Sequence, residues 1–310
     1  MPVGLFNTSW GGAAAEAFTS RQSLEGLEAG REYVELFEQE AAAKASGAEG
    51  EYPRLRENQR PAHLYNGMIY PAAPFAQRGV IWYQGESNAG RAGGYDELMK
   101  TLIDDWRGLW DQPEAAREFP FLTVQLANFR QPRDEPGDDG WASLRDAQMT
   151  TAMTHPQTYI ATAVDIGQAD DIHPTNKQEV GRRLSLIALR NVYGRDDLED
   201  QGPTLAKTHR VDGQPRQQRL HFAHADGLMT RDGEAPRGFA VRAAGDGPWV
   251  WAESAEIHGQ DVLVTAPEGI EAPFDVRYGW ATNPTDGPHG INVYNAAGLP
   301  AFPFEYVADE

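Results

Sequence analysis

Residues 79–88 read Gly-Val-Ile-Trp-Tyr-Gln-Gly-Glu-Ser-Asn, an apolar run of strand length that stops at polar residues. Its β-branched and aromatic residues favour a strand, and so continuous an apolar run is typical of a strand buried on both faces. Over residues 95–110 the apolar residues then recur at the three- and four-residue spacing of an amphipathic helix. This stretch therefore predicts a strand followed by a helix, the repeating unit of parallel sheets.

The same alternation continues on both sides of this unit. Gly194 ends the last expected helix, whose N-cap is Thr175 or Asn176. Because strands alternate with helices, we expect an α/β fold whose parallel sheet is joined by crossover helices. Besides the strand at 79–83, the expected strands are residues 3–6, 121–126 and 159–164, and the other expected helices are residues 31–45, 141–153 and 176–193.

The pattern changes near Arg195. Beyond it, short alternating segments are separated by Gly, Pro and Asp, which is typical of an antiparallel β-sandwich. We therefore expect two domains, residues 1–197 and residues 198–310. The strands expected in the second are residues 220–223, 238–242, 249–252, 262–265 and 275–280.

Composition excludes several classes of partner and site. The formal charge of −19 argues against a nucleic-acid partner, because binding a phosphate backbone needs clustered Lys and Arg. The absence of cysteine excludes disulfides, zinc–thiolate sites and cysteine nucleophiles. No apolar run approaches the roughly 18 residues of a membrane span, and residues 1–6 do not resemble a signal peptide.

Two polar segments follow predicted strands, where ligand sites form in open α/β sheets. The first contains Gly11 and Gly12, a pair that lets backbone N–H groups approach a ligand closely. In the second, Gln84 and Asn88 can donate hydrogen bonds to an oxyanion, and Glu86 can orient a histidine. The alternatives without a function are an ordinary turn for the glycines and a solvated carboxylate for Glu86.

A third segment, residues 170–174, reads Asp-Asp-Ile-His-Pro and opens a predicted helix. A histidine two or three residues after an aspartate suits a general base with its orienting carboxylate, so His173 pairs with Asp171 or Asp170. The alternative without a function is that His173 is a structural or simply exposed histidine. A metal site on the same three residues is disfavoured because no second cluster supplies the remaining ligands.

Five segments taken together resemble the sialate O-acetylesterase family, and they occur in order along nearly the whole chain. Each motif alone is only moderately specific. The segments are residues 2–12, LYNGMIYPAAPFAQRGVIWYQGESN (64–88), DIHPTNKQEVGRRL (171–184), RYGWATNP (277–284) and NVYNAAGLPAFPF (292–304).

The resemblance implies an SGNH-hydrolase fold, a flavodoxin-like three-layer α/β/α sandwich, followed by the C-terminal β-sandwich. It implies His173 as general base, with Asp171, Asp170 or Glu86 as its carboxylate partner. Gly11 or Gly12 would supply a backbone oxyanion donor. Gln84 or Asn88 would supply a side-chain donor beside Gly85. No metal or cofactor is implied.

One feature of that family is missing from this sequence. Its nucleophilic serine lies in a Gly-Gln-Ser-Asn segment upstream of the block that residues 2–12 resemble, and no such segment occurs here. We therefore expect a sheet that lacks its first strand, and a truncated reading frame or fragment. Ser9 and Ser87 are the alternative nucleophiles. The structural interpretation is that their hydroxyls form hydrogen bonds with the loop backbone.

The expected function is therefore release of acetate from O-acetylated sugars, either sialic acid or hemicellulose, by a Ser/His/acid mechanism. The alternative is a non-catalytic sugar-binding or structural remnant, favoured by the missing serine and opposed by the intact histidine segment. The resemblance suggests a periplasmic or secreted location. The sequence leaves the oligomeric state open.

Overall fold

The computed structural model describes residues 4–47, 54–110, 113, 117–245 and 247–308. The chain forms two compact units, each discontinuous in sequence. The first contains residues 1–123 and 147–159, and the second contains residues 124–146 and 160–310. Each unit is described by itself.

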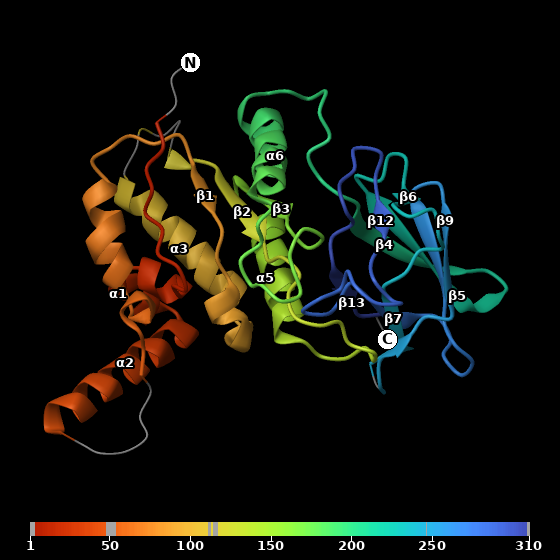
Figure 1. Cartoon of the computed structure of the whole chain (residues 1–310), viewed down its shortest axis with the longest axis horizontal. Helices are drawn as coiled ribbons and strands as arrows, with labels where there is room; N and C mark the ends of the chain where they lie inside the picture. Colours follow the sequence, from red (N-terminus) through yellow and green to blue (C-terminus); the bar gives the residue numbers. More distant parts are fainter. Residues whose placement is uncertain (1–3, 48–53, 111–112, 114–116, 246, 309–310) are drawn as a thin grey trace. The chain divides into compact units, whose positions relative to one another are not determined.

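The helices of the first unit lie mainly before β1 (Figure 1). The Ser20 side chain accepts from the Ser23 amide and so begins α1, while Gly47, in the left-handed conformation, ends α2. α2 and α3 agree with the helices predicted at 31–45 and 95–110. The elements of this part are η1 (Ala15–Phe18), α1 (Arg21–Gly26), α2 (Glu28–Ser46), η2 (Glu57–Gln59), η3 (Tyr65–Ile69), η4 (Tyr70–Ala72), η5 (Glu86–Arg91) and α3 (Tyr95–Trp110).

A three-stranded sheet follows, with strand order β1-β2-β3 and bounds Val80–Trp82, Phe121–Gln125 and Thr158–Thr162. β1 and β2 are parallel, with Val80 opposite Phe121. All five residues of β2 are buried, as expected of a strand covered on both faces. α5 (Gly140–Thr154) connects β2 to β3. The predicted parallel sheet with crossover helices is confirmed.

The strand predicted at residues 3–6 is wrong for residues 4–6, and Val3 lies outside the described residues. Gly4, Leu5 and Phe6 form no strand, and the side chains of Leu5 and Phe6 are 91% and 66% exposed. The physical reason is the lack of a pairing partner, because a strand is stable only when its backbone groups bond to a neighbour. Within the described residues, β1 pairs on one side only, with β2.

The second unit carries the histidine segment and all the antiparallel strands. Asn176 caps α6 (Lys177–Ile187), whose chain continues through η6 (Ala188–Val192). The strands are β4 (Thr204–Val211), β5 (Gln214–Ala223), β6 (Met229–Thr230), β7 (Phe239–Ala243), β8 (Val250–Trp251), β9 (Ser254–His258), β10 (Asp261–Thr265), β11 (Phe274–Tyr278), β12 (Val293–Tyr294) and β13 (Phe304–Tyr306).

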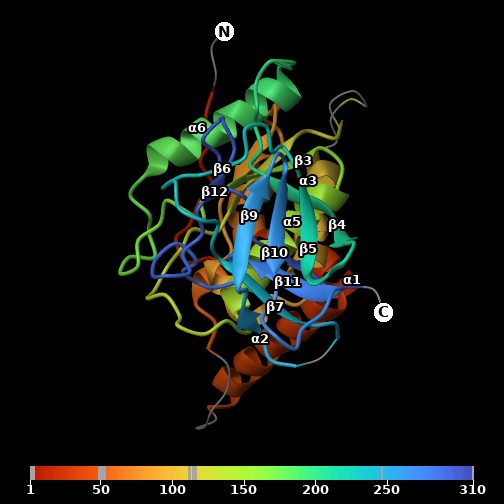
Figure 2. The ribbon, with the colours of Figure 1, turned by 90° about the vertical axis from the view of Figure 1, so that its right-hand side faces the viewer.

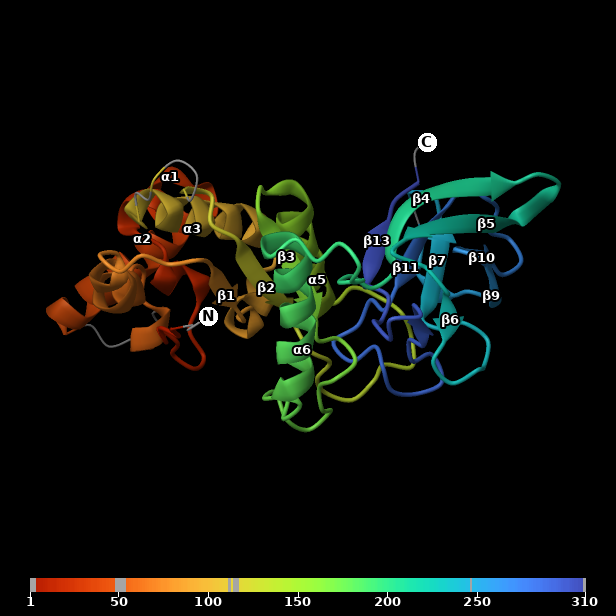
Figure 3. The same cartoon turned by 90° about the horizontal axis from the view of Figure 1, so that it is seen from above.

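These strands form two four-stranded sheets and one pair. The first sheet has the order β4-β5-β10-β9, visible side by side in Figure 2, and the long β4–β5 hairpin stands out in Figure 3. The second has the order β13-β11-β7-β8, and β12 pairs with β6. The predicted antiparallel pairing is confirmed.

One buried cluster joins residues of both four-stranded sheets. Phe222 and Val262 contribute from the first sheet, and Phe239, Val276 and Phe304 contribute from the second. The β5 burial pattern alternates over residues 218–222, so that Leu220 and Phe222 face this core. None of the described helices is both long and apolar enough to cross a bilayer.

Candidate active site

The predicted glycine turn lies on the surface of the first unit. Gly11 and Gly12 are both exposed, and Gly12 has a φ of 71°. Their carbonyl oxygens accept hydrogen bonds from Asn58 Nδ2 at 2.6 Å and from Ser87 Oγ at 2.9 Å. In the described part of the chain neither amide N–H has an acceptor. The turn is therefore fixed through its carbonyls, and its two exposed residues keep N–H groups that no described residue accepts.

Gln84 and Asn88 are buried and bonded to each other. Gln84 Nε2 donates to Ala13 O at 3.0 Å and to Asn88 Oδ1 at 2.7 Å, and Gln84 Oε1 accepts from Tyr95 Oη at 2.8 Å. Asn88 Nδ2 donates to the buried carboxylate of Glu16 at 2.9 Å. Both side-chain amides thus donate to internal acceptors, whereas the glycine N–H groups have no acceptor among the described residues.

Arg91 and Glu16 complete this network. Arg91 Nη1 lies 2.5 Å from Glu16 Oε1, and Glu16 is 3% exposed. Gly85 is buried and directly precedes η5. Glu86 is the first residue of η5 and is half-buried. Because the network ties the loop after β1 to residues 13–16, Glu86 and the glycine turn are held on the same framework. Sequence reasoning missed Glu16 and Arg91, which carry no motif of their own.

His173 lies on the loop between β3 and α6 in the second unit. Its side chain is 85% exposed, and its Nδ1 lies 3.4 Å from Asp171 Oδ1. The same carboxylate oxygen accepts the His173 backbone N–H at 2.8 Å. Asp170 is exposed on this loop. The structure therefore brings His173 and Asp171 together, and it leaves the imidazole open to a reacting partner.

A buried ion pair anchors the beginning of this loop. Asp165 follows β3 and accepts from Arg183 Nη1 at 2.6 Å and Nη2 at 3.0 Å, with both side chains 4% exposed. Arg183 also donates to Thr162 O at 2.7 Å and to Glu179 Oε1 at 2.8 Å. Hydrogen bonds from Arg182, followed by those from Arg183, lower the pKa of Glu179 to about 2. The pair joins the end of β3 to α6.

The next residues of the loop are fixed by a close backbone contact. Gly167 N donates to Asn128 Oδ1 at 2.6 Å, and a Cβ at position 167 would lie 2.1 Å from Asn128 O. Only glycine fits there. Gln168 forms a parallel bridge to Phe129, which follows β2 in the chain. The loop that carries His173 is therefore held from Asp165 to Gln168.

The predicted site residues are divided between the two units. The first unit contains Gly11, Gly12, Gln84, Gly85, Glu86 and Asn88, and the second contains Asp170, Asp171 and His173. Each group lies on a segment that follows a strand or an expected strand, as the sequence predicts. Their convergence into one site stays a prediction.

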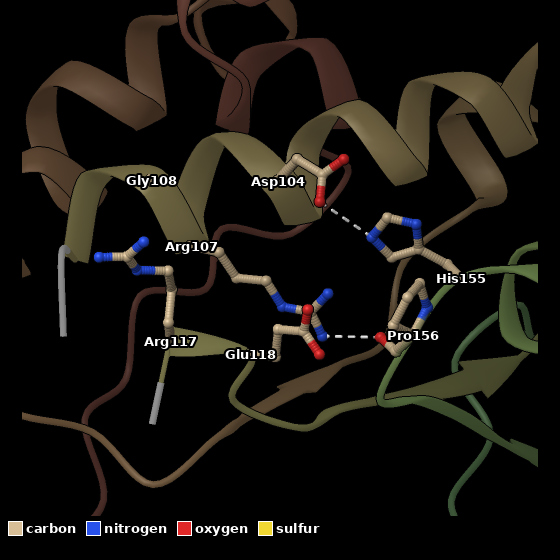
Figure 4. Close-up of a pocket in the computed structure, with 7 residues that line it drawn as sticks. All are labelled: Asp104, Arg107, Gly108, Arg117, Glu118, His155 and Pro156. Atoms are coloured by element: carbon tan, nitrogen blue, oxygen red, sulfur yellow. Dashed lines mark hydrogen bonds and ion pairs between the residues drawn. The ribbon is translucent and has the colours of Figure 1, made fainter. Parts of the chain in front are cut away.

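A pocket of about 570 Å³ occurs elsewhere in the first unit (Figure 4). Arg107 Nη2 donates there to Phe119 O at 3.0 Å and to Pro156 O at 2.9 Å, carbonyls that precede β2 and β3. His155 Nε2 lies 3.1 Å from Asp104 Oδ1, and burial lowers the pKa of this histidine. None of the predicted site residues lines this pocket. Its lining is Asp104, Arg107, Gly108, Arg117, Glu118, His155 and Pro156.

Within the described ranges, Glu199, Asp200 and His224 are the group whose side chains could meet around a metal ion. His224 Nδ1 lies 2.9 Å from Glu199 Oε1, and Asp200 Oδ2 accepts from Asn191 Nδ2 at 2.5 Å. Arg190 Nε adds a positive charge 3.4 Å from Asp200. These contacts already give each of the three side chains a partner, and none of the three is a predicted site residue.

Comparison with known proteins shows which family this chain resembles. Residues 48–189 match the family described as carbohydrate esterase, sialic acid-specific acetylesterase. The sialate O-acetylesterase of Mus musculus is 28% identical over 98% of this chain, and that of Homo sapiens is 27% identical over all of it. The chain spans 60% and 58% of the length of these relatives.

A solved structure agrees with these matches. A carbohydrate acetylesterase from Xanthomonas citri, known from its crystal structure, is 35% identical in sequence to this chain. The two structures superpose with a TM-score of 0.76, and the match covers 98% of this chain and 60% of the other. The predicted resemblance is thereby confirmed. The chain is thus similar to the sialic acid-specific acetylesterases among the carbohydrate esterases.

Proposed function

We propose that this chain carries the acid–base part of a carbohydrate O-acetylesterase site, with His173 as the general base. The observation that carries the proposal is the anchored loop after β3, on which an exposed imidazole lies beside the Asp171 carboxylate. A general base needs an accessible imidazole whose other nitrogen is oriented by a carboxylate. Asp171 is the partner that we favour over Asp170 and Glu86, because its carboxylate lies 3.4 Å from the ring.

In the proposed reaction, His173 takes the proton of a serine hydroxyl as the serine oxygen attacks the acetyl carbonyl. The sugar leaves with a proton returned by His173, an acetyl-enzyme remains, and water attacks it to release acetate. The N–H groups of Gly11 and Gly12, which have no acceptor among the described residues, would stabilise the negative oxygen of each tetrahedral intermediate. Gln84 and Asn88 then act mainly by holding the loop after β1 in place, since their amides have internal acceptors.

The proposed fold of residues 1–197 is the flavodoxin-like three-layer sandwich. Residues 198–310 are proposed to form a separate β-sandwich. In the flavodoxin-like strand order 2-1-3-4-5, the strand that carries the nucleophile would lie beside β1. Two observations support this. β1 has one partner among the described residues, and Ile81 on that strand is 63% exposed although it is a large apolar residue. A neighbouring strand would pair the free edge of β1.

The proposed substrates are O-acetylated sugars, with sialic acid and acetylated hemicellulose as the two candidates, and a periplasmic or secreted location fits both. A non-catalytic sugar-binding role is the second candidate. It is favoured by the absence of a Gly-Gln-Ser-Asn segment from these 310 residues. The two candidates differ in whether acetate is released once a nucleophile is supplied.

We expect the 310-residue chain by itself to give no acetyl-enzyme burst with an aryl acetate, because His173 without a nucleophile can only activate water. Stopped-flow release of the aryl alcohol measures this. A burst with a stoichiometry near one would contradict the proposed division of roles. It would assign the nucleophile to Ser9 or Ser87, which Ser9→Ala and Ser87→Ala would separate.

The acetylesterase proposal itself is tested by supplying the serine. The chain is fused behind a segment bearing the Gly-Gln-Ser-Asn motif, and acetate release from O-acetylated sialic acid and from acetylated xylan is measured. We expect release from at least one substrate, and none when the added serine is alanine. A folded fusion that binds these sugars but releases no acetate would support the non-catalytic role instead.

A further inference from the structure

The loop that carries His173 is held by residues from the C-terminal part of the chain as well as by α6. Tyr294, on β12, donates its hydroxyl to Asp165 Oδ2 at 3.0 Å. Arg231, beside β6, lies 4.0 Å from the same carboxylate and 5.5 Å from the Tyr294 ring centre. The anchor of the loop is thus completed by residues on or beside the β12–β6 pair, and Tyr294 lies 129 residues beyond Asp165 in the chain.

A second contact of the same kind fixes Asn128, which holds Gly167. Asn128 Nδ2 donates to Thr285 Oγ1 at 2.8 Å and lies 3.4 Å from Asn283 Oδ1. Asn283 in turn donates to Arg130 O at 2.6 Å. Because Asn128 contacts the loop on one side and the segment around Asn283 on the other, it transmits the position of that segment to Gly167.

The third contact is the fully buried guanidinium of Arg145 on α5. It donates to Leu126 O and Ala127 O, both at 2.8 Å, at the end of β2. It also donates to Ala281 O at 2.6 Å and to Thr282 O at 3.0 Å. One side chain therefore joins the end of β2 to the segment 281–285.

We propose that Tyr294, Asn283 and Thr285 are positioning residues for the loop that carries His173, so that the C-terminal part of the chain acts as a brace of the site. The inference rests on the proposed role of His173. It gives a physical function to two segments, RYGWATNP and NVYNAAGLPAFPF, that contain no group of the proposed chemistry. Tyr294, Asn283 and Thr285 lie within them or directly after the first.

The chemistry of Tyr294 suits this role. Burial, followed by the negative charge of Asp165, raises the pKa of Tyr294 to about 12, so its hydroxyl remains a donor at neutral pH. A neutral hydroxyl that donates to a buried carboxylate makes a charge-assisted hydrogen bond, which is about twice as strong as a neutral one. Tyr294→Phe removes that bond and leaves the ring in place, while Arg183 still neutralises Asp165.

We expect Tyr294→Phe to speed amide hydrogen exchange at Ile166 and Gly167 by about tenfold or more, the effect of losing one charge-assisted bond. Exchange in β5 and β10 should not change. We also expect a shift of the His173 ring signals in NMR spectra. The matched control is Tyr33→Phe, which removes the hydroxyl that donates to Gln59 O at 2.9 Å in the first unit. It should leave both loop readouts unchanged.

Thr285→Val is the second variant, in case Tyr294→Phe does not fold. It removes a hydroxyl that contacts Asn128 and should act on Gly167 in the same direction. Unchanged loop exchange and unchanged His173 signals in either folded variant would overturn the proposal, as would a uniform rise in exchange throughout the second unit. Because neither readout needs ester turnover, failure of the brace and failure of the esterase function are observed separately.

Discussion

Replacing His173 by alanine in the serine-supplied chain is expected to lower kcat for acetate release by at least about 10³-fold. The loss of a general base removes the proton acceptor for the serine and the proton donor for the leaving sugar, and single losses within such a triad are this large or larger. Steady-state rates on an O-acetylated sugar measure the effect.

The matched control for His173→Ala is His209→Ala, which removes another exposed histidine, on β4. It should leave kcat and KM unchanged. A near-normal rate for His173→Ala would remove this residue from the mechanism. The carboxylate partner of His173 is then identified with three single substitutions, Asp171→Asn, Asp170→Asn and Glu86→Gln. The substitution that removes the partner should lower kcat, and the other two should leave kcat unchanged.

Asp165→Ala is expected to lower the free energy of unfolding by about 3–5 kcal/mol. The substitution removes the buried carboxylate that accepts two hydrogen bonds from Arg183, and breaking a buried ion pair by removing one partner costs this much even though Glu179 still contacts Arg183. Urea denaturation measures the change. In Asp165→Leu with Arg183→Met, where neither charge remains, most of the loss should be recovered, because apolar replacement of a buried pair is often near neutral.

The control for Asp165→Ala breaks an ion pair that is not buried. Glu253 pairs with Arg216, and their side chains are 50% and 35% exposed. Glu253→Ala should therefore cost less than about 1 kcal/mol. Equal costs for Asp165→Ala and Glu253→Ala would show that burial of the Asp165 pair contributes little, and that the loop does not depend on it.

Periodicity and turn chemistry predicted most of the fold. The helix at 95–110 was expected with the bounds of α3, and Asn176 was one of two expected caps of α6. The strand expected at 3–6 is absent at residues 4–6, because an apolar run becomes a strand only when a neighbour pairs with it, and pairing partners cannot be read from the run itself. Local pattern gives the element type, whereas the register and the neighbour depend on the rest of the sheet.

The candidate site was predictable in part for the same reason. His173, Asp171 and the glycine pair lie in motifs of recognisable chemistry, and the structure places His173 beside Asp171. The residues that hold them have no such motif. Arg145 lies in an ordinary helical sequence, yet its guanidinium reaches four carbonyls from two distant segments. Long-range contacts of this kind depend on the tertiary fold.

We predict that Gly11, Gly12 and Glu86 converge with His173 in one active site, and a distance measurement tests this prediction most directly. The chain has no cysteine, so His173→Cys gives a single attachment point for a nitroxide spin label. Amide signals are compared between the oxidised and the reduced label in NMR spectra. If Gly11, Gly12 and Glu86 lie within side-chain reach, about 10 Å, their signals should disappear in the oxidised sample. Undiminished signals at all three positions would contradict the active-site assignment.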